Sequence, residues 1–200
     1  TEESVIHDFL EPDYEKLNDP FLFKDMQKAL ERINHAIQSQ EKVAIYADYD
    51  ADAITACSVL YLAFKKLGLT PVSYIPDRFT EGSGMNQDAI RKLAEDKVSL
   101  IITVDCGTNA VIEANLCQEL GIDLIITDHH EVTGPLPEAY AIINPKNPED
   151  NYPFEFLTGV GVAYKLVQAL YSAERPGMSA EGWEKWLLDL VAIGTVADCQ

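Results

Sequence analysis

Short runs of apolar residues alternate along this chain with segments in which apolar residues recur every three or four positions. Unbroken apolar runs predict buried strands at 43–47, 99–104 and 122–127. Two shorter runs, at 71–75 and 140–143, predict further strands. Because the longer runs lack the alternation of a half-buried strand, we expect a sheet that is covered on both faces.

Helices are predicted in the segments between and after these runs. In the first of them Met26, Leu30 and Ile33 recur at helical spacing, which indicates an amphipathic helix. The predicted helices span 24–39, 54–67, 87–96, 159–171 and 180–193, with one more that is capped by Thr108 or Asn109 and ends before Gly121.

The order of these elements predicts the fold class. Strands that alternate with helices of ten or more residues imply right-handed crossover connections. We therefore expect an α/β fold, a doubly wound and mostly parallel sheet with helices on both faces and a helical C-terminal part. Residues 1–23 are polar and contain Pro12 and Pro20, so we expect them to form a lead-in segment that packs on a domain of residues 24–200.

Acidic residues and histidines follow three of the predicted strands. They are Asp48, Asp50 and Asp52 after the first strand, Asp105 after the strand at 99–104, and Asp128, His129 and His130 after the strand at 122–127. Ligands of open α/β sheets bind outside the carboxyl ends of the strands. We therefore expect these side chains to share one site.

The chemistry of these side chains points to a hard divalent cation. Carboxylate oxygens with a few imidazoles favour Mn²⁺ or Mg²⁺ over a thiolate zinc site, and the imidazoles favour Mn²⁺. So many acids predict two ions about 4 Å apart, the arrangement used for in-line displacement at phosphorus. The alternative is that Asp48 and Asp52 cap a helix and that His129 and His130 form an exposed turn.

Composition changes this picture in one respect. The chain has 33 acidic and 15 basic residues and a formal net charge of -18, so it repels a phosphate backbone unless something neutralises the acids locally. The alternative is that these acids are scattered over the surface and only keep the protein soluble.

The four cysteines lack paired spacing, and neither a signal peptide nor a bilayer-length apolar run is visible. We expect a cytoplasmic protein without membrane contact.

Four short motifs give a family resemblance. The segments 48–52, 104–107, 128–130 and 194–198, the last of them ending in Asp198, occur in the order of the four motifs of DHH-family phosphoesterases. The chain resembles that family over nearly its whole length. Within the family, the segments 76–82, 143–145 and 157–163 resemble the RecJ-like branch of single-strand-specific exonucleases.

The resemblance implies a catalytic domain that holds two Mn²⁺ or Mg²⁺ ions. The implied metal ligands are Asp50, Asp52, Asp105, His129 and Asp198, with Asp105 between the two ions and Asp48 as a further ligand or a supporting acid. Asp128 would orient an imidazole without touching a metal.

Other residues would meet the substrate. His130 would contact the scissile phosphate, where a protonated imidazole stabilises negative charge. Arg78 and Asn86, in the loop opposite, would hold substrate phosphate. For Arg78, a surface salt bridge is the alternative.

The implied reaction is hydrolysis of single-stranded DNA from its 5′ end, with release of mononucleotides in the 5′ to 3′ direction, in DNA repair and recombination. A single-strand-binding protein or a helicase would be a partner. The alternatives are a phosphodiesterase for short oligonucleotides, cyclic dinucleotides or polyphosphate, and a non-catalytic replication scaffold. The family also leads us to expect a second domain and an OB-fold that lie outside these 200 residues.

Three positions depart from the family pattern. Ala53 stands where glycine is usual, and a methyl group costs little there if the residue is helical. Ser83 stands where an aromatic residue is common, which removes a possible base-stacking platform. Tyr46 stands where several relatives with small substrates carry a metal-binding histidine, and it favours the RecJ-like branch.

Overall fold

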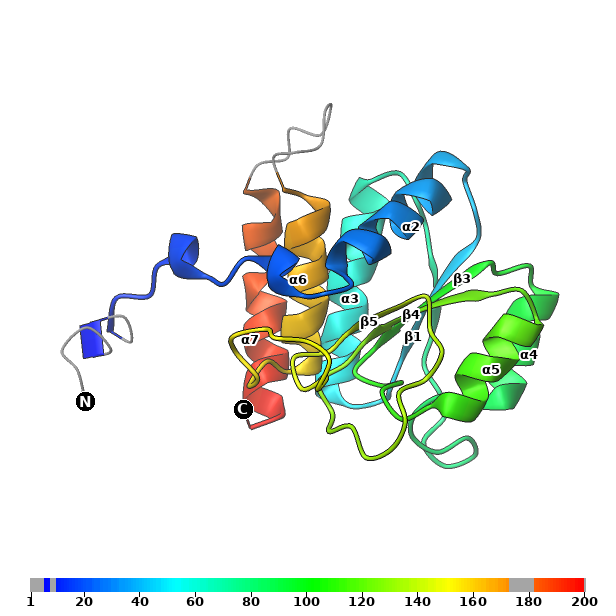
Figure 1. The fold of residues 1–200 in the computed structure, drawn as a ribbon. Helices are drawn as coiled ribbons and strands as arrows, with labels where there is room; N and C mark the ends of the chain where they lie inside the picture. The colour runs from blue at the N-terminus through cyan, green and yellow to red at the C-terminus, as the bar shows by residue number, and fades with distance from the viewer. Residues whose placement is uncertain (1–5, 8–9, 173–181, 200) are drawn as a thin grey trace.

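A five-stranded parallel sheet forms the centre of the molecule (Figure 1). The computed structural model describes residues 6–7, 10–172 and 182–199. The strands are β1 (Val43–Ala47), β2 (Val72–Tyr74), β3 (Leu100–Val104), β4 (Asp123–Thr127) and β5 (Ala141–Ile143), and all four neighbouring pairs are parallel. Each strand lies within one residue of its predicted bounds, and the α/β class is confirmed.

The strand order, β2-β1-β3-β4-β5, contains one reversal. The chain passes from β1 to β2 on one side and then returns across β1 to form β3 on the other. The carboxyl ends of β1 and β3 therefore diverge into separate connections, which leaves a crevice where α/β proteins bind their ligands.

Helices cover both faces of the sheet, which confirms the doubly wound arrangement. They are α2 (Met26–Gln38), α3 (Ala51–Lys66), α4 (Gln87–Glu95), α5 (Val111–Glu119), α6 (Gly159–Leu170) and α7 (Leu188–Ala197), with short 3-10 turns η1 (Tyr14–Lys16), η2 (Pro20–Leu22) and η3 (Trp183–Leu187). The apolar residues of α4 and α5 form one core cluster, and those of α2, α3 and α6 form another on the opposite face. Figure 1 shows these two groups on either side of the strands.

The strands alternate between these two clusters although every residue is buried. Val43, Ile45 and Ala47 of β1 pack into the cluster of α2, α3 and α6, whereas Ala44 and Tyr46 pack into the other. All five are at most 1% exposed. A strand that buries both of its faces needs apolar residues throughout, which explains the unbroken runs in the sequence.

Some helix boundaries differ from the prediction. Helix α3 begins at Ala51 and not at 54, with Asp50 as its cap. The last helix was predicted over 180–193; residues 180–181 lie outside the described residues, and α7 continues to Ala197. Gly194 lies within this helix and packs closely against α3 beside Thr55 and Asp52. The cap of α5 was also wrong: Ala110 occupies that position and makes no side-chain cap.

The lead-in segment packs on the main body from Tyr14 onward, whereas the described residues before it are exposed and extend away (Figure 1). The hydroxyl of Tyr14 lies 3.1 Å from the hydroxyl of Tyr164 on α6 and donates to Glu184 Oε1 at 3.1 Å. The ring of Phe23 stacks on Tyr152, with centroids 3.7 Å apart. Among the described residues, no helix has the length and apolar character needed to cross a membrane.

The burial pattern of α3 gives a test of this fold. Leu60 is 0% exposed and Leu62 is 41% exposed on the same helix. Leu60→Ala should lower the free energy of unfolding by about 2–5 kcal/mol because it leaves a cavity. Leu62→Ala should change it by about 0.5 kcal/mol or less. Urea denaturation followed by circular dichroism measures both, and equal losses would contradict the placement of α3.

Candidate metal centre

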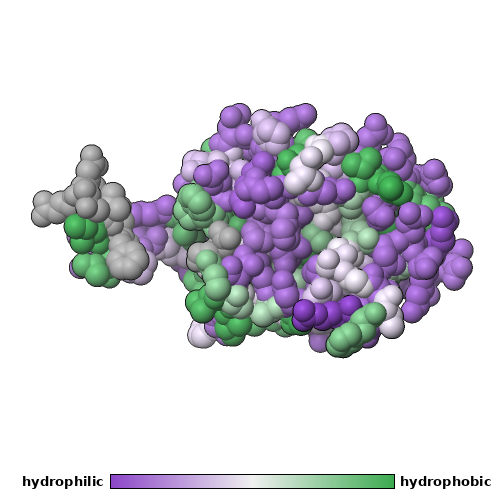
Figure 2. All heavy atoms as spheres, turned by 90° about the horizontal axis from the view of Figure 1, so that it is seen from below, coloured by the Kyte–Doolittle hydropathy of each residue, from purple (hydrophilic) through white to green (hydrophobic). Residues whose placement is uncertain are grey.

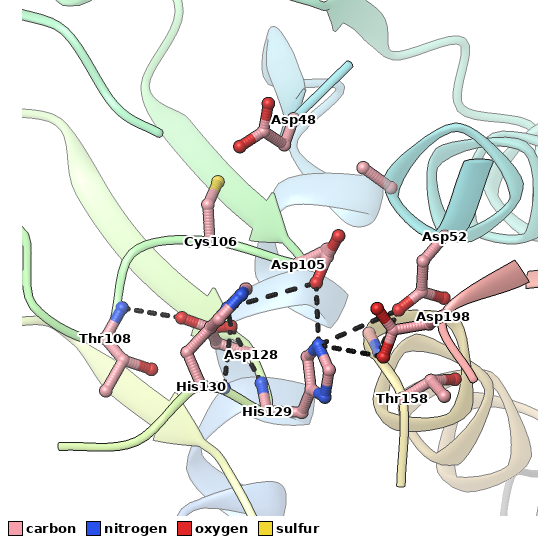
Figure 3. A network of polar contacts seen from close by, with 12 residues as sticks. Asp48, Asp52, Asp105, Cys106, Thr108, Asp128, His129, His130, Thr158 and Asp198 are labelled. Atoms are coloured by element: carbon pink, nitrogen blue, oxygen red, sulfur yellow. Dashed lines mark hydrogen bonds and ion pairs between the residues drawn. The ribbon is translucent and has the colours of Figure 1, made fainter. Parts of the chain in front are cut away.

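Side chains from four separate segments meet at the carboxyl edge of the sheet (Figure 3). They are Asp52 in the first turn of α3, Asp105 after β3, His129 after β4 and Asp198 at the end of α7. His129 Nε2 lies 3.0 Å from Asp105 Oδ1. The same nitrogen lies 3.8 Å from Asp52 Oδ2 and 3.8 Å from Asp198 Oδ2. We call these four residues the acid–imidazole cluster.

Asp105 is the most constrained of the four. Its backbone has a φ of 59°, a left-handed conformation that is uncommon outside glycine. Its N–H donates to the carbonyl oxygen of Thr127 at 3.0 Å, which fixes the turn after β3 against β4. The side chain is buried, and its Oδ1 faces His129 Nε2 at 3.0 Å without satisfying hydrogen-bond geometry. Burial, reinforced by the charge of Asp52, raises its pKa to about 7 although His129 opposes this.

Asp52 is held by the start of α6. Its Oδ2 accepts a hydrogen bond from the N–H of Gly159 at 2.6 Å, and its Oδ1 accepts one from the N–H of Val160 at 2.8 Å. These amides have no partner within the helix, and the helix dipole there favours an anion. Burial still raises the pKa of Asp52, and the two amides oppose this shift.

Two glycines allow α6 and α7 to approach the acids. A Cβ atom on Gly159 would lie 2.5 Å from Asp105 Cβ, and one on Gly194 would lie 2.8 Å from Asp52 Oδ1. A larger residue at 159 would displace Asp105, and one at 194 would displace Thr55, Val160 or Asp52. Sequence reasoning noted these glycines only as part of family motifs. A cap-forming Thr158 directly before Gly159 was the available signal for a helix start at the site.

Asp128 holds His130, and it does not join the cluster. Its Oδ1 lies 2.7 Å from His130 Nδ1 and accepts the N–H of His129 at 2.7 Å, while its Oδ2 accepts the N–H of Thr108 at 2.8 Å. This contact with Asp128 raises the pKa of His130 to about 9. Burial alone would raise the pKa of Asp128, but the hydrogen bond and charge of His130 together with the hydrogen bonds from Thr108 lower the pKa of that carboxyl.

Asp48 and Asp50 make local contacts beside the cluster. Asp48 accepts hydrogen bonds from the N–H of Tyr49 at 2.7 Å and of Gly84 at 3.1 Å, which ties β1 to the 76–86 loop. Asp50 is exposed and caps α3 through the N–H of Ala53 at 2.9 Å. Figure 3 shows Asp48 apart from the four cluster residues. A metal role for these two acids stays a prediction.

The two residues assigned to substrate phosphate lie in or next to the 76–86 loop and have different surroundings. Arg78 is exposed and lies over the ring of Tyr49, 5.2 Å from its centroid. Asn86 caps α4 by accepting the N–H of Ala89 at 2.8 Å, and its amide donates to Tyr46 Oη at 3.1 Å. Arg78 is thus available to an anion, whereas the side chain of Asn86 already has structural partners.

The positions that depart from the family pattern are accommodated. Ala53 is helical and fully buried, so the methyl group brings no left-handed strain. Tyr46 stacks on Tyr74 with centroids 5.1 Å apart, and its hydroxyl donates to the carbonyl oxygen of Gly84 at 3.1 Å. Tyr46 therefore supports the 76–86 loop. Ser83 is exposed in that loop.

The cluster has the donors and the charge that a hard divalent cation requires. It offers oxygens from three carboxylates and one imidazole nitrogen, a set typical of Mn²⁺ or Mg²⁺. Two of its acids are only 2% exposed, and no lysine or arginine within the described ranges forms a salt bridge with them. Buried carboxylates without a counter-charge are costly. The residues therefore fit a metal ion.

The fold and this cluster together define the class of protein. The family model described as "DHH family, N-terminal domain" matches residues 42–195. The chain belongs to the DHH family.

Individual relatives fall within one branch of that family. The single-stranded-DNA-specific exonuclease RecJ of Bacillus subtilis (strain 168) is 52% identical over 180 residues, which are 90% of this chain and 22% of that protein. A crystal structure of exonuclease RecJ bound to manganese matches with a TM-score of 0.76 and 31% identity over 88% of this chain and 43% of that one. RecJ from Thermus thermophilus in complex with Mn²⁺ matches with a TM-score of 0.75 and 28% identity, over 94% of this chain and 26% of that one. This chain spans about a fifth of the length of the Bacillus subtilis relative.

Two glycines of α6 provide a matched test of the cluster geometry. Gly159→Ala should weaken Mn²⁺ binding at least about tenfold, because its Cβ would meet Asp105. Gly161→Ala changes the same helix, but its Cβ would meet only Leu157 and Thr158, at 3.3 Å or more. Isothermal titration calorimetry measures the affinities, and thermal unfolding checks that both variants fold. Equal affinities in the two variants would show that the close approach of α6 is irrelevant to the site.

The Asp128 contact predicts a titration that can be measured without metal. In Asp128→Asn the pKa of His130 should fall from about 9 toward its ordinary value of 6.5. In the wild type the pKa of His130 is higher in the folded state than in the unfolded state. Its ion pair with Asp128 therefore makes its full contribution to stability below pH 6.5. That contribution is lost as the pH rises through about 9. NMR titration of the imidazole signals measures the change, with His35 as internal control; an unchanged His130 curve would contradict the assignment.

Proposed function

We propose that this chain is a metal-dependent phosphodiesterase that hydrolyses single-stranded DNA with two Mn²⁺ or Mg²⁺ ions. One observation supports this most directly. Two groups of side chains have ligand atoms within 4.8 Å of one another, Asp105 with His129 and His130, and Asp52 with His129 and Asp198. The two groups place further donors on both sides of His129 (Figure 3), which supports a pair of ions of which His129 would ligate one. The Bacillus subtilis relative named above is a single-stranded-DNA-specific exonuclease, and the two solved RecJ structures hold manganese.

The proposed ligands are the four residues of the cluster, to which the family resemblance adds Asp48 and Asp50. The ions would be held by Asp48, Asp50, Asp52, Asp105, His129 and Asp198. Such ions would acidify water and offset the charge that develops on the phosphate during hydrolysis. The backbone turn at Asp105 and the α6 amides on Asp52 keep two of these carboxylates aimed at one point.

His130 has the properties of a phosphate-binding residue. Its side chain is 57% exposed, so it can reach a substrate that cannot enter the buried cluster. Asp128 keeps the imidazole protonated at neutral pH, because its contact raises the pKa to about 9. A fixed imidazolium would donate to a non-bridging phosphate oxygen and stabilise its charge. Arg78 would add a second positive charge from the 76–86 loop.

The finer features of the reaction are part of the same proposal. We infer hydrolysis from the 5′ end with release of mononucleotides, in DNA repair and recombination, with a single-strand-binding protein or a helicase as partner. Residues 24–200 would form the catalytic domain of a cytoplasmic enzyme. These features come from the family resemblance and remain predictions.

A metal-dependence assay tests the central proposal. A single-stranded oligonucleotide should release mononucleotides in Mn²⁺, and EDTA should abolish the release. Asp105→Ala should remove at least about 99% of the activity, since about 2.7 kcal/mol or more of transition-state stabilisation depends on a residue of this kind. Its circular dichroism spectrum should be unchanged. Hydrolysis that continues in EDTA would refute the proposal.

The two neighbouring histidines should separate metal binding from turnover. His129→Ala should weaken Mn²⁺ binding, because its Nε2 faces three carboxylates. His130→Ala should leave Mn²⁺ affinity nearly unchanged and lower kcat about a hundredfold, the scale expected for one lost oxyanion donor. Calorimetry and steady-state kinetics on the two variants measure these effects. Identical behaviour of the two variants would rule out this division of roles.

A further inference from the structure

The direction of the His130 side chain depends on hydrogen bonds. That side chain is 57% exposed, and its ring lies against the ring of His129 with centroids 4.7 Å apart. Figure 2 shows the molecule from below, the side on which α7 ends in Figure 1, and its middle is largely hydrophilic. An exposed ring on such a surface gains little from apolar packing. A residue that meets a substrate in one geometry therefore needs a fixed backbone and fixed hydrogen-bond partners.

Asn144 holds the backbone of His130. It follows β5 directly and is 0% exposed. Its amide nitrogen donates to the carbonyl oxygen of His130 at 2.9 Å and to Thr108 Oγ1 at 2.8 Å. Its Oδ1 accepts the N–H of Lys146 at 2.8 Å. Because an asparagine amide has two N–H donors, Asn144 uses both of them at this edge of the sheet.

These contacts join the ends of three neighbouring strands. Thr108 follows β3, His130 follows β4 and Asn144 follows β5, and the sheet places these strands side by side. The N–H of Thr108 donates to Asp128 Oδ2 at 2.8 Å, and Asp128 Oδ1 lies 2.7 Å from His130 Nδ1. Figure 3 shows Thr108, Asp128 and His130 in this chain of contacts. Asn144 therefore contacts the backbone of His130 directly and reaches the carboxylate that holds its ring through Thr108.

The segment after His130 has a weaker tie. Asn109 Nδ2 donates to the carbonyl oxygen of Glu131 and its Oδ1 accepts the N–H of Thr133, both at 2.9 Å, but Asn109 is exposed. Water competes for the groups of an exposed hydrogen bond, whereas loss of a buried one leaves its partner unpaired. Removal of the Asn144 amide would take this partner from the buried hydroxyl of Thr108. The buried amide is thus the contact on which the position of His130 depends most.

We propose that Asn144 is a positioning residue that fixes the imidazole of His130 toward the phosphate of the substrate. The inference rests on the proposed function, because it gives Asn144 a part in the turnover step assigned to His130. Asn144 is fully buried, so it cannot touch the substrate itself. Its side-chain hydrogen bonds go to Thr108, His130 and Lys146, and none of these belongs to the acid–imidazole cluster. Its role should therefore be visible in turnover and not in metal binding.

A double-mutant cycle tests this role. Asn144→Ala should lower kcat for single-stranded DNA about tenfold, because the imidazole would then face the phosphate for less of the time. In a His130→Ala background the same substitution should lower kcat by about twofold or less, since the side chain that Asn144 positions is gone. Steady-state kinetics of the four proteins measures both effects, and calorimetry should show that Asn144→Ala leaves Mn²⁺ affinity unchanged. Equal losses of kcat in the two backgrounds would overturn the proposal.

Asn147→Ala is the matched control. Asn147 is also buried, at 6% exposed, and lies in the same loop after β5. Its Oδ1 accepts the N–H of Glu149 at 3.0 Å, a contact within the loop. The substitution should keep kcat within about twofold of the wild type. A loss as large as that of Asn144→Ala would mean that any damage to this loop impairs turnover, and it would overturn the assignment to Asn144.

Proton exchange at His130 provides a readout that needs neither metal nor DNA. The contact with Asp128 should protect the Nδ1 proton of His130 from exchange with water. NMR should show this exchange at least about tenfold faster in Asn144→Ala and unchanged in Asn147→Ala.

A second variant keeps the test decisive if the alanine variant folds poorly. Asn144→Asp retains the size of the side chain and the acceptor for the N–H of Lys146, but it loses both donors. It should show the same faster exchange at His130 and the same loss of kcat. Wild-type behaviour of Asn144→Asp would overturn the role of the amide.

The exchange measurement separates this proposal from the proposed function. Faster exchange in both Asn144 variants, with no hydrolysis of DNA by the wild-type protein, would support the positioning of His130 and overturn the proposed function alone. Hydrolysis by the wild-type protein, with exchange and kcat unchanged in both Asn144 variants, would overturn the positioning role alone.

Discussion

Two buried carboxylates govern this structure. Asp52 and Asp105 are each 2% exposed, and burial of charge without a partner is among the most costly events in folding. The fold offsets this cost from two sides: the imidazole of His129 faces Asp105, and the first amides of α6 meet Asp52. The remaining negative charge calls for a cation. The stability of the apo protein and its affinity for metal are therefore properties of the same few contacts.

That constraint also explains how the helices pack. To bring amides to Asp52, the start of α6 must come within contact distance of Asp105, and only a residue without a Cβ fits at position 159. The same holds for α7, where Gly194 packs against α3 beside Asp52. Apolar burial holds α3 and α6 together, but the glycines set the distance between them. The place of Asp52 is thus built into the helix packing, whereas Asp105 and His129 are placed by the turns after β3 and β4.

The sequence predicted the sheet well because its strands bury both faces, which leaves an unbroken apolar run such as 43–47. The meeting of Asp105 with His129 also follows from topology, since both come after adjacent parallel strands. The partners of Asp52 could not be predicted. They lie 107 and 108 residues away, and no local pattern reports a contact between a carboxylate and a distant helix start. Asn86 shows the reverse case: an asparagine directly before a helix is a cap signal, and the structure shows that cap.

The charge balance of the chain bears on how a polyanion can approach this centre. With a net charge of -18, the protein repels a phosphate backbone at long range. Close to the cluster, His130 is held as a cation by Asp128, and Arg78 is exposed over Tyr49 without a salt bridge to any described residue. Two fixed positive charges cannot offset the acids around them. Divalent ions would therefore act twice, first by lowering the repulsion that keeps a strand away and then in the chemistry itself. Substrate affinity and catalytic rate should for this reason both rise with metal occupancy. This coupling follows from the position of the acids at the site and not from their number alone.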